Sequence, residues 1–443
     1  MKISFVQPNG RNAFSICPEP PLGLAYLASS LLEYNNDLDI EIIDGFILSY
    51  DDYVKKLSQL KADVIGVTST TSLLGEAFKI PGIVNDKSAI FMIGGPGVMG
   101  IPSTRLHECG YSIVCYGEGE RTIVELIQAI EKDLPLEKVR GISFISKGKE
   151  MRTAPRQLIE NLDEIPFPAR HLLDMHTYTN AWKKNMGVGF SPIISSRGCQ
   201  FSCRFCSKSI FGNVIRFRSA QNIIEEMRQL YDEYGVEQVF FEDDLFTQNR
   251  KRVLDFCDAM ARELPGKKWG AMARVDTVDY ETLSRMKQAG CIELAFGVES
   301  GSQAILDLLK KRITVEQVKR TFKLANEIGI MTGMFLIVGI PGETDEDMNL
   351  TKNLIAEAEP KWVNIFILTP LPGTEIYEMT KHLIREDVDF CDFNDSFGGA
   401  YRKEVFEVDP MDRMKDLMSF YLERFKGEID PRFSIYDGSL MKN

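Results

Sequence analysis

Short apolar runs alternate with helical patterns along the first 150 residues. Runs of this length between turn residues predict strands, and single helices between strands predict parallel pairing. We therefore expect an α/β fold that begins with a Rossmann-like, doubly wound parallel sheet. The predicted strands are Ile3–Val6, Ile40–Ile43, Val64–Thr68, Ala89–Ile93 and Ile113–Cys115, and the clearest helices are Leu22–Tyr34, Asp52–Leu60 and Glu120–Glu131.

A second alternation of strands and helices begins near residue 191. Its helix Ala220–Tyr234 carries its apolar residues on one face, as a helix that packs on a sheet does. Six parallel strands with helices between them predict a partial (β/α)6 barrel, whose functional groups gather at the carboxyl ends of the strands. The predicted strands are Ile193–Ser196, Gln238–Phe241, Lys268–Ala273, Ile292–Gly297, Met331–Val338 and Val363–Leu368.

The remaining segments divide the chain into four parts. Residues 151–190 form a connector, in which Pro166 and Pro168 disfavour helix and predict an extended crossing. Residues 376–443 have a helical pattern without a recognisable module. The expected organisation is therefore a sheet domain at 1–150, the connector at 151–190, a barrel at 191–375 and a helical region at 376–443.

Composition narrows the possible partners and the compartment. The chain is 44% hydrophobic and 26% charged, as in a soluble globular protein. Its net charge of −12 argues against general nucleic-acid binding, which needs a broad basic face. Nine cysteines without paired spacing indicate a reducing compartment. Because the N-terminus begins as a strand and no apolar run reaches ~20 residues, we expect a cytoplasmic protein without a membrane span.

The most informative stretch is a cysteine triplet at the start of the predicted barrel. Cys199, Cys203 and Cys206 have the spacing C-x3-C-x2-C, and Phe205 precedes the last thiol. Fe–S clusters are ligated by cysteine thiolates, so three of them can hold a 4Fe–4S cube and leave one iron open for chemistry. A zinc knuckle and three unrelated buried cysteines are the alternatives. Structural zinc takes four ligands, and the nearest histidine, His176, lies well upstream.

The triplet, Phe205 and the strand-like residues before them resemble the radical S-adenosylmethionine (SAM) superfamily. This resemblance implies SAM contacts at the carboxyl ends of successive barrel strands. Glu242 and its two neighbours stand where most members have Gly-Gly-Glu against the methionine amino group, Arg274 could pair with the methionine carboxylate, and Glu299 could accept from the ribose hydroxyls. Alone, each carboxylate would be interpreted as a helix cap or a surface ion pair. The expected SAM-binding residues are Phe205, Glu242, Asp243, Asp244, Arg274, Asp276, Glu299, Ser300 and Gly339.

Small and hydroxyl-bearing residues follow the last three predicted strands of the first domain. Glycine allows a ligand to approach the backbone, although tight strand–helix turns also use it for structural reasons. Together with the Pro20–Ala28 segment, these loops resemble the cobalamin-binding domain fused to one class of radical SAM enzymes. The expected cobalamin-binding residues are Thr68, Ser69, Thr70, Ser72, Gly94, Gly95, Gly97, Gly117, Glu118 and Gly119.

One departure from cobalamin domains concerns the cobalt ligand. Domains that ligate cobalt carry Asp-x-His-x-x-Gly, whereas this chain has no histidine before His107. The resemblance therefore implies cobalamin without a protein histidine on cobalt, and His107 is interpreted as an ordinary helix residue. Gly97 also stands where many relatives have histidine. A domain that keeps the fold and has lost the corrinoid is the alternative.

Together the resemblances imply an enzyme that cleaves SAM reductively to a 5′-deoxyadenosyl radical. They favour a cobalamin-dependent methyltransferase that acts on an unactivated carbon of a small molecule and uses a reductant such as flavodoxin or ferredoxin. A radical cyclase, dehydratase or rearrangement enzyme is the main alternative. Methylthio transfer would need a second cluster, but Cys17, Cys109 and Cys115 form no compact ligand run. A non-catalytic metal-binding or scaffold protein would leave the SAM-site residues without a purpose.

Overall fold

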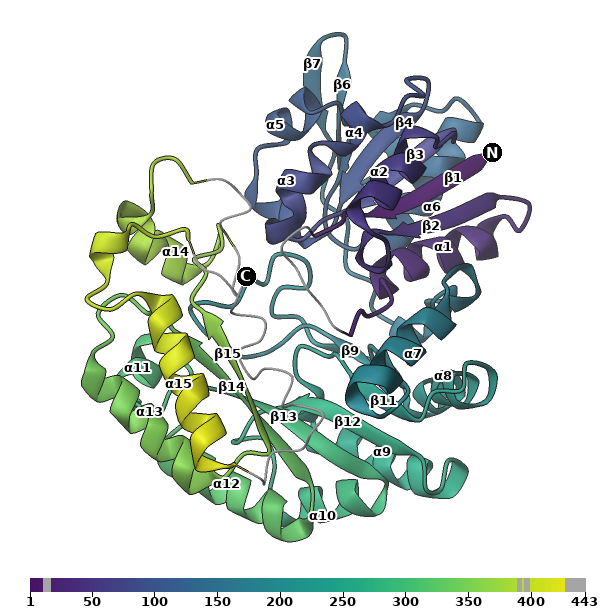
Figure 1. Cartoon of the computed structure of the whole chain (residues 1–443). Helices are drawn as coiled ribbons and strands as arrows, with labels where there is room; N and C mark the ends of the chain where they lie inside the picture. The colour runs from purple at the N-terminus through teal and green to yellow at the C-terminus, as the bar shows by residue number, and fades with distance from the viewer. Residues whose placement is uncertain (11–16, 389–392, 394–398, 427–443) are drawn as a thin grey trace. The chain divides into compact units, whose positions relative to one another are not determined.

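The computed structural model describes residues 1–10, 17–388, 393 and 399–426, which fall into two units (Figure 1). The first unit is built from Met1–Tyr178 with the short segment Lys208–Gly212, and the second from Thr179–Ser207, Asn213–Val388 and the residues described after them. The finer division expected at residues 150, 190 and 375 stays a prediction.

A seven-stranded sheet forms the centre of the first unit, in the order β2-β1-β3-β4-β5-β6-β7. Neighbours from β2 to β5 run parallel, whereas β6 and β7 are antiparallel. The strands are β1 (Lys2–Gln7), β2 (Asp39–Asp44), β3 (Val64–Thr68), β4 (Ile90–Gly94), β5 (Ile113–Cys115), β6 (Ile142–Ser146) and β7 (Lys149–Arg152). The helices are α1 (Leu22–Tyr34), α2 (Tyr50–Ser58), α3 (Leu74–Ala77), α4 (Ile80–Ile83), α5 (Ser103–Glu108) and α6 (Glu120–Glu131).

Alternating strand residues enter two separate cores on the two faces of this sheet. Ile3 and Phe5 of β1 are buried with residues of α1 and α6, whereas Val6 is buried with residues of α2 and α4. The predicted doubly wound sheet is therefore confirmed. The five predicted strands are parallel as expected, but the antiparallel β6–β7 hairpin at one edge was not predicted; it turns through Lys147 and Gly148, both with positive φ. Because β7 is short and mostly exposed, it lacks the apolar run from which strands were predicted.

The second unit contains a six-stranded parallel sheet in the order β15-β14-β13-β12-β11-β8. Helices α8 to α13 lie outside its curve (Figure 1), and this confirms the open barrel. The strands are β8 (Phe190–Ile193), β11 (Gln238–Phe241), β12 (Lys268–Ala273), β13 (Cys291–Glu299), β14 (Met331–Val338) and β15 (Trp362–Ile367). The helices are α8 (Ala220–Glu233), α9 (Arg250–Glu263), α10 (Tyr280–Gln288), α11 (Gln303–Leu308), α12 (Val315–Ile328), α13 (Asp345–Ala358), α14 (Glu375–Thr380) and α15 (Pro410–Arg424).

Two expectations near the start of the barrel were wrong. The first strand is Phe190–Ile193 rather than Ile193–Ser196, because it pairs with β11 from Phe190 onward and Ser195 turns to a carboxylate instead. Pro192 is tolerated there because β8 is an edge strand. The connector also contains a helix, α7 (Met175–Met186), beyond its two prolines. Among the described residues, no helix is long and apolar enough to cross a membrane.

Candidate active site

The cysteine triplet lies in the loop between the short strands β9 (Ser196–Arg197) and β10 (Arg216–Phe217). Cys199 and Cys203 are half-buried, Cys206 is exposed, and none of them forms a disulfide. The loop therefore follows the carboxyl end of the first barrel strand, which is the edge where such barrels hold their functional groups.

Both the start and the middle of this loop are anchored. Gly198 has a φ of +89°, and a Cβ there would lie 2.3 Å from the carbonyl oxygen of Val214, so the close approach requires glycine. The backbone N–H of Arg204 donates to the carbonyl of Leu309 at 3.0 Å, and its Nε pairs with Glu375 at 2.9 Å. The end of α11 and the start of α14 thus hold the middle of the loop.

The chemistry of this donor set fits an iron–sulfur cluster better than a single ion. Within the described part of the chain, no three His, Cys, Asp or Glu side chains are grouped closely enough to hold one metal ion. A cubane cluster distributes three thiolates over three different irons, so its ligands need not converge on one point. Cys199, Cys203 and Cys206 are the residues that would hold it.

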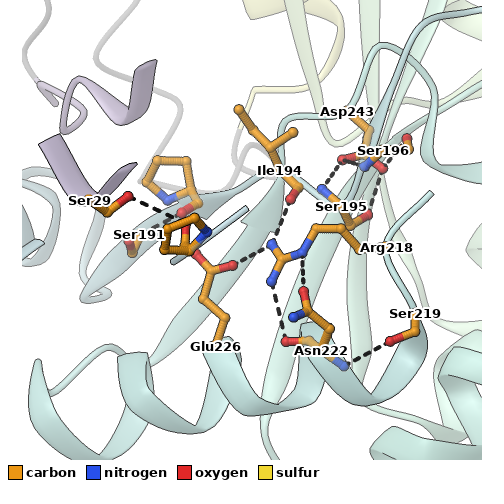
Figure 2. Close-up of polar contacts among 12 residues, drawn as sticks. Ser29, Ser191, Ile194, Ser195, Ser196, Arg218, Ser219, Asn222, Glu226 and Asp243 are labelled. Atoms are coloured by element: carbon orange, nitrogen blue, oxygen red, sulfur yellow. Dashed lines mark hydrogen bonds and ion pairs between the residues drawn. The ribbon is translucent and has the colours of Figure 1, made fainter. Parts of the chain in front are cut away.

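Asp243, at the carboxyl end of β11, holds the segment that leads into the cysteine loop (Figure 2). Its Oδ1 accepts from the backbone N–H groups of Ser195 and Ser196 at 2.6 and 3.1 Å. Its Oδ2 accepts from their hydroxyls at 2.7 and 2.6 Å. Arg252 lies 3.7 Å from the same carboxylate, which is fully buried. The structure therefore places Asp243, which was expected to bind SAM, against the segment that leads into the cysteine loop.

The two neighbours of Asp243 lie at the same strand end. Asp244 accepts from the backbone N–H of Gly198 at 2.9 Å, and Gln248 donates to the carbonyl of Gly198 at 3.0 Å. Glu242 is half-buried, and its backbone N–H continues the pairing with β8 by donating to Ile193 at 2.9 Å. Two of the three carboxylates at this strand end thus bind the segment before Cys199.

A buried ion pair supports the same segment from α8 (Figure 2). Arg218 donates to the carboxylate of Glu226 and, at 2.8 Å, to the carbonyl oxygen of Ile194. Its Nε donates to Asn222 at 2.6 Å, and Ser219 caps α8 by accepting from the N–H of Asn222. Sequence reasoning missed this pair. The eight-residue separation of Arg218 from Glu226 gives no sign of the contact, because α8 begins between them.

Arg274 and Asp276, which follow β12, form a bidentate ion pair. Nε and Nη2 of Arg274 donate to the two oxygens of Asp276 at 2.9 and 3.0 Å, and Nη2 also donates to the carbonyl of Lys311 at 2.8 Å. Nη1 lies 3.9 Å from Sγ of Cys203, and the guanidinium lies 3.7 Å from the ring centre of Phe201. The structure therefore brings this pair to the cysteine loop.

Glu299, at the carboxyl end of β13, is paired with a residue that sequence reasoning missed. Its carboxylate accepts from Nζ of Lys311 at 2.5 Å, and both side chains are less than 10% exposed. Glu299 has a φ of +77°, and Lys310 and Arg312 on either side of Lys311 also have positive φ. Strained backbone of this kind clusters at functional sites. Nζ of Lys311 also lies 5.9 Å from the ring of Phe205 in the cysteine loop.

The last two expected SAM residues have structural partners. Ser300 is buried, and its hydroxyl accepts from the N–H of Ser302 at 3.1 Å. Gly339 has a φ of +73°, and its N–H donates to Glu343 at 2.9 Å. Burial raises the pKa of Glu343 to about 7. Arg413 of α15 lies 3.9 Å from this carboxylate, so the C-terminal helix reaches the loop after β14.

In the first unit, the expected cobalamin residues follow β3, β4 and β5. The strand order reverses between β1 and β3, and ligands of open α/β sheets bind at such a switch point. Ser69 is buried and donates to the carbonyl of Thr70 at 2.8 Å. The hydroxyl of Thr70, an exposed residue, lies 3.2 Å from that of Ser72, whereas Thr68 is half-buried at the end of β3.

Two glycines after β4 are explained by packing between loops. A Cβ on Gly95, whose φ is +96°, would lie 2.8 Å from the carbonyl oxygen of Ser69. A Cβ on Gly97 would lie 2.6 Å from the carbonyl oxygen of Thr70. Gly94 accepts from the N–H of Ser69 at 3.0 Å. The glycine run thus joins the loop after β4 to the loop after β3, so it does not by itself indicate a ligand.

In the loop after β5, the three expected cobalamin-binding residues have different surroundings. Gly117 has a φ of +76° and open space where a Cβ would be, whereas a Cβ on Gly119 would lie 2.6 Å from Leu27. Glu118 is buried and accepts from the backbone N–H of Ile159 at 2.7 Å. Glu118 therefore holds the connector, and Gly117 is the residue of this loop that leaves room for a ligand.

His107 is held by the fold as an ordinary residue of α5. Its Nδ1 lies 2.8 Å from the carbonyl oxygen of Tyr111, and its Nε2 lies 2.8 Å from the hydroxyl of Ser143. Both ring nitrogens therefore have protein partners. The loops after β3, β4 and β5 offer hydroxyl and backbone groups, which fit a corrin without a protein histidine on cobalt.

Comparisons of the sequence with known proteins agree with this geometry. Residues 18–127 match the B12 binding domain, and residues 193–355 match the Radical SAM superfamily. An uncharacterized methyltransferase of Pyrococcus horikoshii is 36% identical over 387 residues, which cover 85% of this chain and 83% of that protein. An anaerobic magnesium-protoporphyrin IX monomethyl ester cyclase of Cereibacter sphaeroides is 29% identical over 89% of this chain and 65% of its own length.

The fold also resembles that of a solved structure. The radical SAM methyltransferase TsrM of Kitasatospora setae, solved with cobalamin and a [4Fe-4S] cluster, has a TM-score of 0.73 at 16% identity. The match covers 96% of this chain and 89% of TsrM. Both domain types predicted from the sequence are therefore confirmed. The chain belongs to the radical SAM superfamily, in the group whose members carry a B12-binding domain ahead of the radical SAM domain.

Proposed function

We propose that this protein is a cobalamin-dependent radical SAM methyltransferase that acts on an unactivated carbon of a small molecule. The observation that carries the proposal is the combination, in one chain, of a B12-binding domain and a barrel whose cysteine loop follows its first strand. The 36% identity to a methyltransferase over most of both chains favours methyl transfer.

Different residues of the barrel are proposed to hold the cluster and to bind SAM. Cys199, Cys203 and Cys206 would hold a 4Fe–4S cluster, which supplies the electron that breaks a sulfur–carbon bond of SAM. Glu242 and Glu299, at the ends of β11 and β13, are the carboxylates proposed for the methionine amino group and the ribose hydroxyls. A carboxylate suits both partners because each of them donates hydrogen bonds.

In the first unit, the loops that contain Thr70, Ser72 and Gly117 would surround a corrinoid, which carries the methyl group between donor and substrate. A donor such as flavodoxin or ferredoxin would supply the electron. We place the protein in the cytoplasm, because a reducing compartment keeps cysteine ligands as thiols. Nucleic acid is not proposed as a partner, since the net charge is −12.

The proposal is tested by the products of SAM after anaerobic loading with iron, sulfide and hydroxocobalamin, with dithionite added as the electron donor for SAM cleavage. Methyl transfer yields S-adenosylhomocysteine as well as 5′-deoxyadenosine, whereas a radical rearrangement yields 5′-deoxyadenosine alone. The matched control replaces Cys199, Cys203 and Cys206 by alanine, and it should bind the corrinoid but lose the cluster absorbance.

The outcomes separate the candidate functions. Deoxyadenosine without S-adenosylhomocysteine, from protein that holds its corrinoid, would instead favour the cyclase class to which one relative belongs. Iron binding without cleavage of SAM would favour a non-catalytic protein. Four irons retained by the triple variant would show that the cluster ligands are assigned wrongly.

A further inference from the structure

Arg274 is a buried cation that the structure aims at a predicted cluster ligand. Its Nη1 donates toward Sγ of Cys203 at 3.9 Å. The side chain is 6% exposed, so little water competes for this group. Arginine stays ionised at any physiological pH, so the group that faces the sulfur carries positive charge.

The position of Arg274 is fixed from several sides. The bidentate pair with Asp276 sets the plane of the guanidinium, and the carbonyl of Lys311 accepts from Nη2 at 2.8 Å. Phe201, two residues before Cys203, lies against the face of the same group at 3.7 Å. The cysteine loop thus contacts Arg274 through both an aromatic ring and a thiol.

These contacts use each of the three nitrogens of Arg274. Binding the carboxylate of SAM in the bidentate manner would require Arg274 to leave Asp276 or the carbonyl of Lys311. An arginine that already holds a bidentate partner has little reason to exchange it for a similar carboxylate. The contact with Cys203 involves Nη1, the nitrogen that the Asp276 pair leaves unused.

We infer that Arg274 is a positioning residue that raises the reduction potential of the cluster through its contact with Cys203. The inference rests on the proposed function, since it needs a cluster on the three cysteines. Hydrogen bonds to the ligand sulfurs help to set the potential of Fe–S clusters. Reduction adds one negative charge to the cluster, so a nearby cation and N–H donor stabilise the reduced form more than the oxidised form.

The test is an EPR-monitored redox titration of the reconstituted holoenzyme without SAM. Arg274→Met keeps much of the side-chain length but removes the charge and the donors, so the midpoint potential should move to a more negative value. Arg274→Lys keeps the charge and should lie between Arg274→Met and the unmodified protein. Asp276→Asn removes the compensating anion and should move the potential in the opposite direction, to a less negative value.

SAM affinity, measured by equilibrium binding, distinguishes this role from the carboxylate role expected from the sequence. An unchanged potential with a tenfold weaker SAM affinity in Arg274→Met would overturn the inference. If both Arg274 variants fail to hold a cluster, Asp276→Asn still decides, because an unchanged or more negative potential in that variant contradicts the proposed sign. Failure of the unmodified protein to take up four irons would refute the proposed function instead.

Discussion

Replacing Asp243 by alanine should destabilise the barrel strongly, whereas asparagine should be tolerated. Asp243 accepts four hydrogen bonds from Ser195 and Ser196, and its side chain is fully buried. Alanine would leave two buried backbone N–H groups without an acceptor, at roughly 1–3 kcal/mol each, or about 2–6 kcal/mol in total. This is a large part of the roughly 5–15 kcal/mol that stabilises a typical domain.

The Asp243→Asn variant separates the geometry from the charge. Both backbone N–H groups bond to Oδ1 of Asp243, and the amide oxygen of the substituted side chain can take the place of this atom. The two serine hydroxyls can rotate and accept from the new NH2 group. We therefore expect a loss of about 1–2 kcal/mol, the scale of a charge-assisted bond replaced by a neutral one.

Urea unfolding followed by tryptophan fluorescence measures the difference in stability between the two variants for the second unit of the chain. The three tryptophans of the chain, Trp182, Trp269 and Trp362, all belong to the second unit, as Asp243 does. Iron content after reconstitution should fall in Asp243→Ala and stay near the unmodified level in Asp243→Asn. A stable Asp243→Asn protein with full iron and tenfold weaker SAM binding would refute this reasoning and return Asp243 to the SAM site.

Three further predictions follow from the same contacts. Burial raises the pKa of Glu343 to about 7, above its value near 4.5 in the unfolded chain. The protonated carboxyl therefore contributes its full stabilisation below about pH 4.5, and this contribution is lost as the pH rises through 7. Glu343→Gln should remove that part of the pH dependence, of order 3 kcal/mol, and equal Tm changes between pH 5 and 8 in both proteins would contradict it. Glu299→Gln should weaken SAM binding roughly tenfold in an equilibrium assay while the cluster absorbance remains; unchanged affinity would place the ribose elsewhere. His107→Ala should leave the EPR spectrum of the reduced Co(II) form unchanged and without nitrogen splitting, because both ring nitrogens already have protein partners; splitting that disappears in this variant would show that His107 is the cobalt ligand.

Most strands and helices could be predicted because each is one apolar run or one amphipathic stretch bounded by turn residues. The helices α1 and α6 and the strands β11, β12 and β14 have the predicted bounds. Several elements were missed, including β6, β7 and α7. β7 is mostly exposed. α7 lies in the connector, for which Pro166 and Pro168 predicted an extended conformation, but the helix begins seven residues after the second proline.

The positions of the site residues at the strand ends could be predicted from the sequence, but the residues that each of them contacts could not. Charged residues at the carboxyl ends of β11, β12 and β13 could be read from the sequence, because parallel strands bring those ends to one edge. Their roles depend on contacts between residues far apart in the chain. Asp243 binds serines 47 and 48 residues earlier, and Arg274 lies beside a cysteine 71 residues earlier.

Three of the residues expected to bind SAM contact the cysteine loop or the segment that leads into it. Asp243, Asp244 and Arg274 hold the cysteine loop from the ends of β11 and β12. A loop held by three strand-end residues presents its thiols in a set arrangement, and such preorganisation lowers the cost of binding. The same strand ends also carry Glu242, which is half-buried, and the buried ion pair between Glu299 and Lys311. SAM carries an ammonium, a carboxylate and ribose hydroxyls, and a carboxylate together with a carboxylate–ammonium pair would complement these groups.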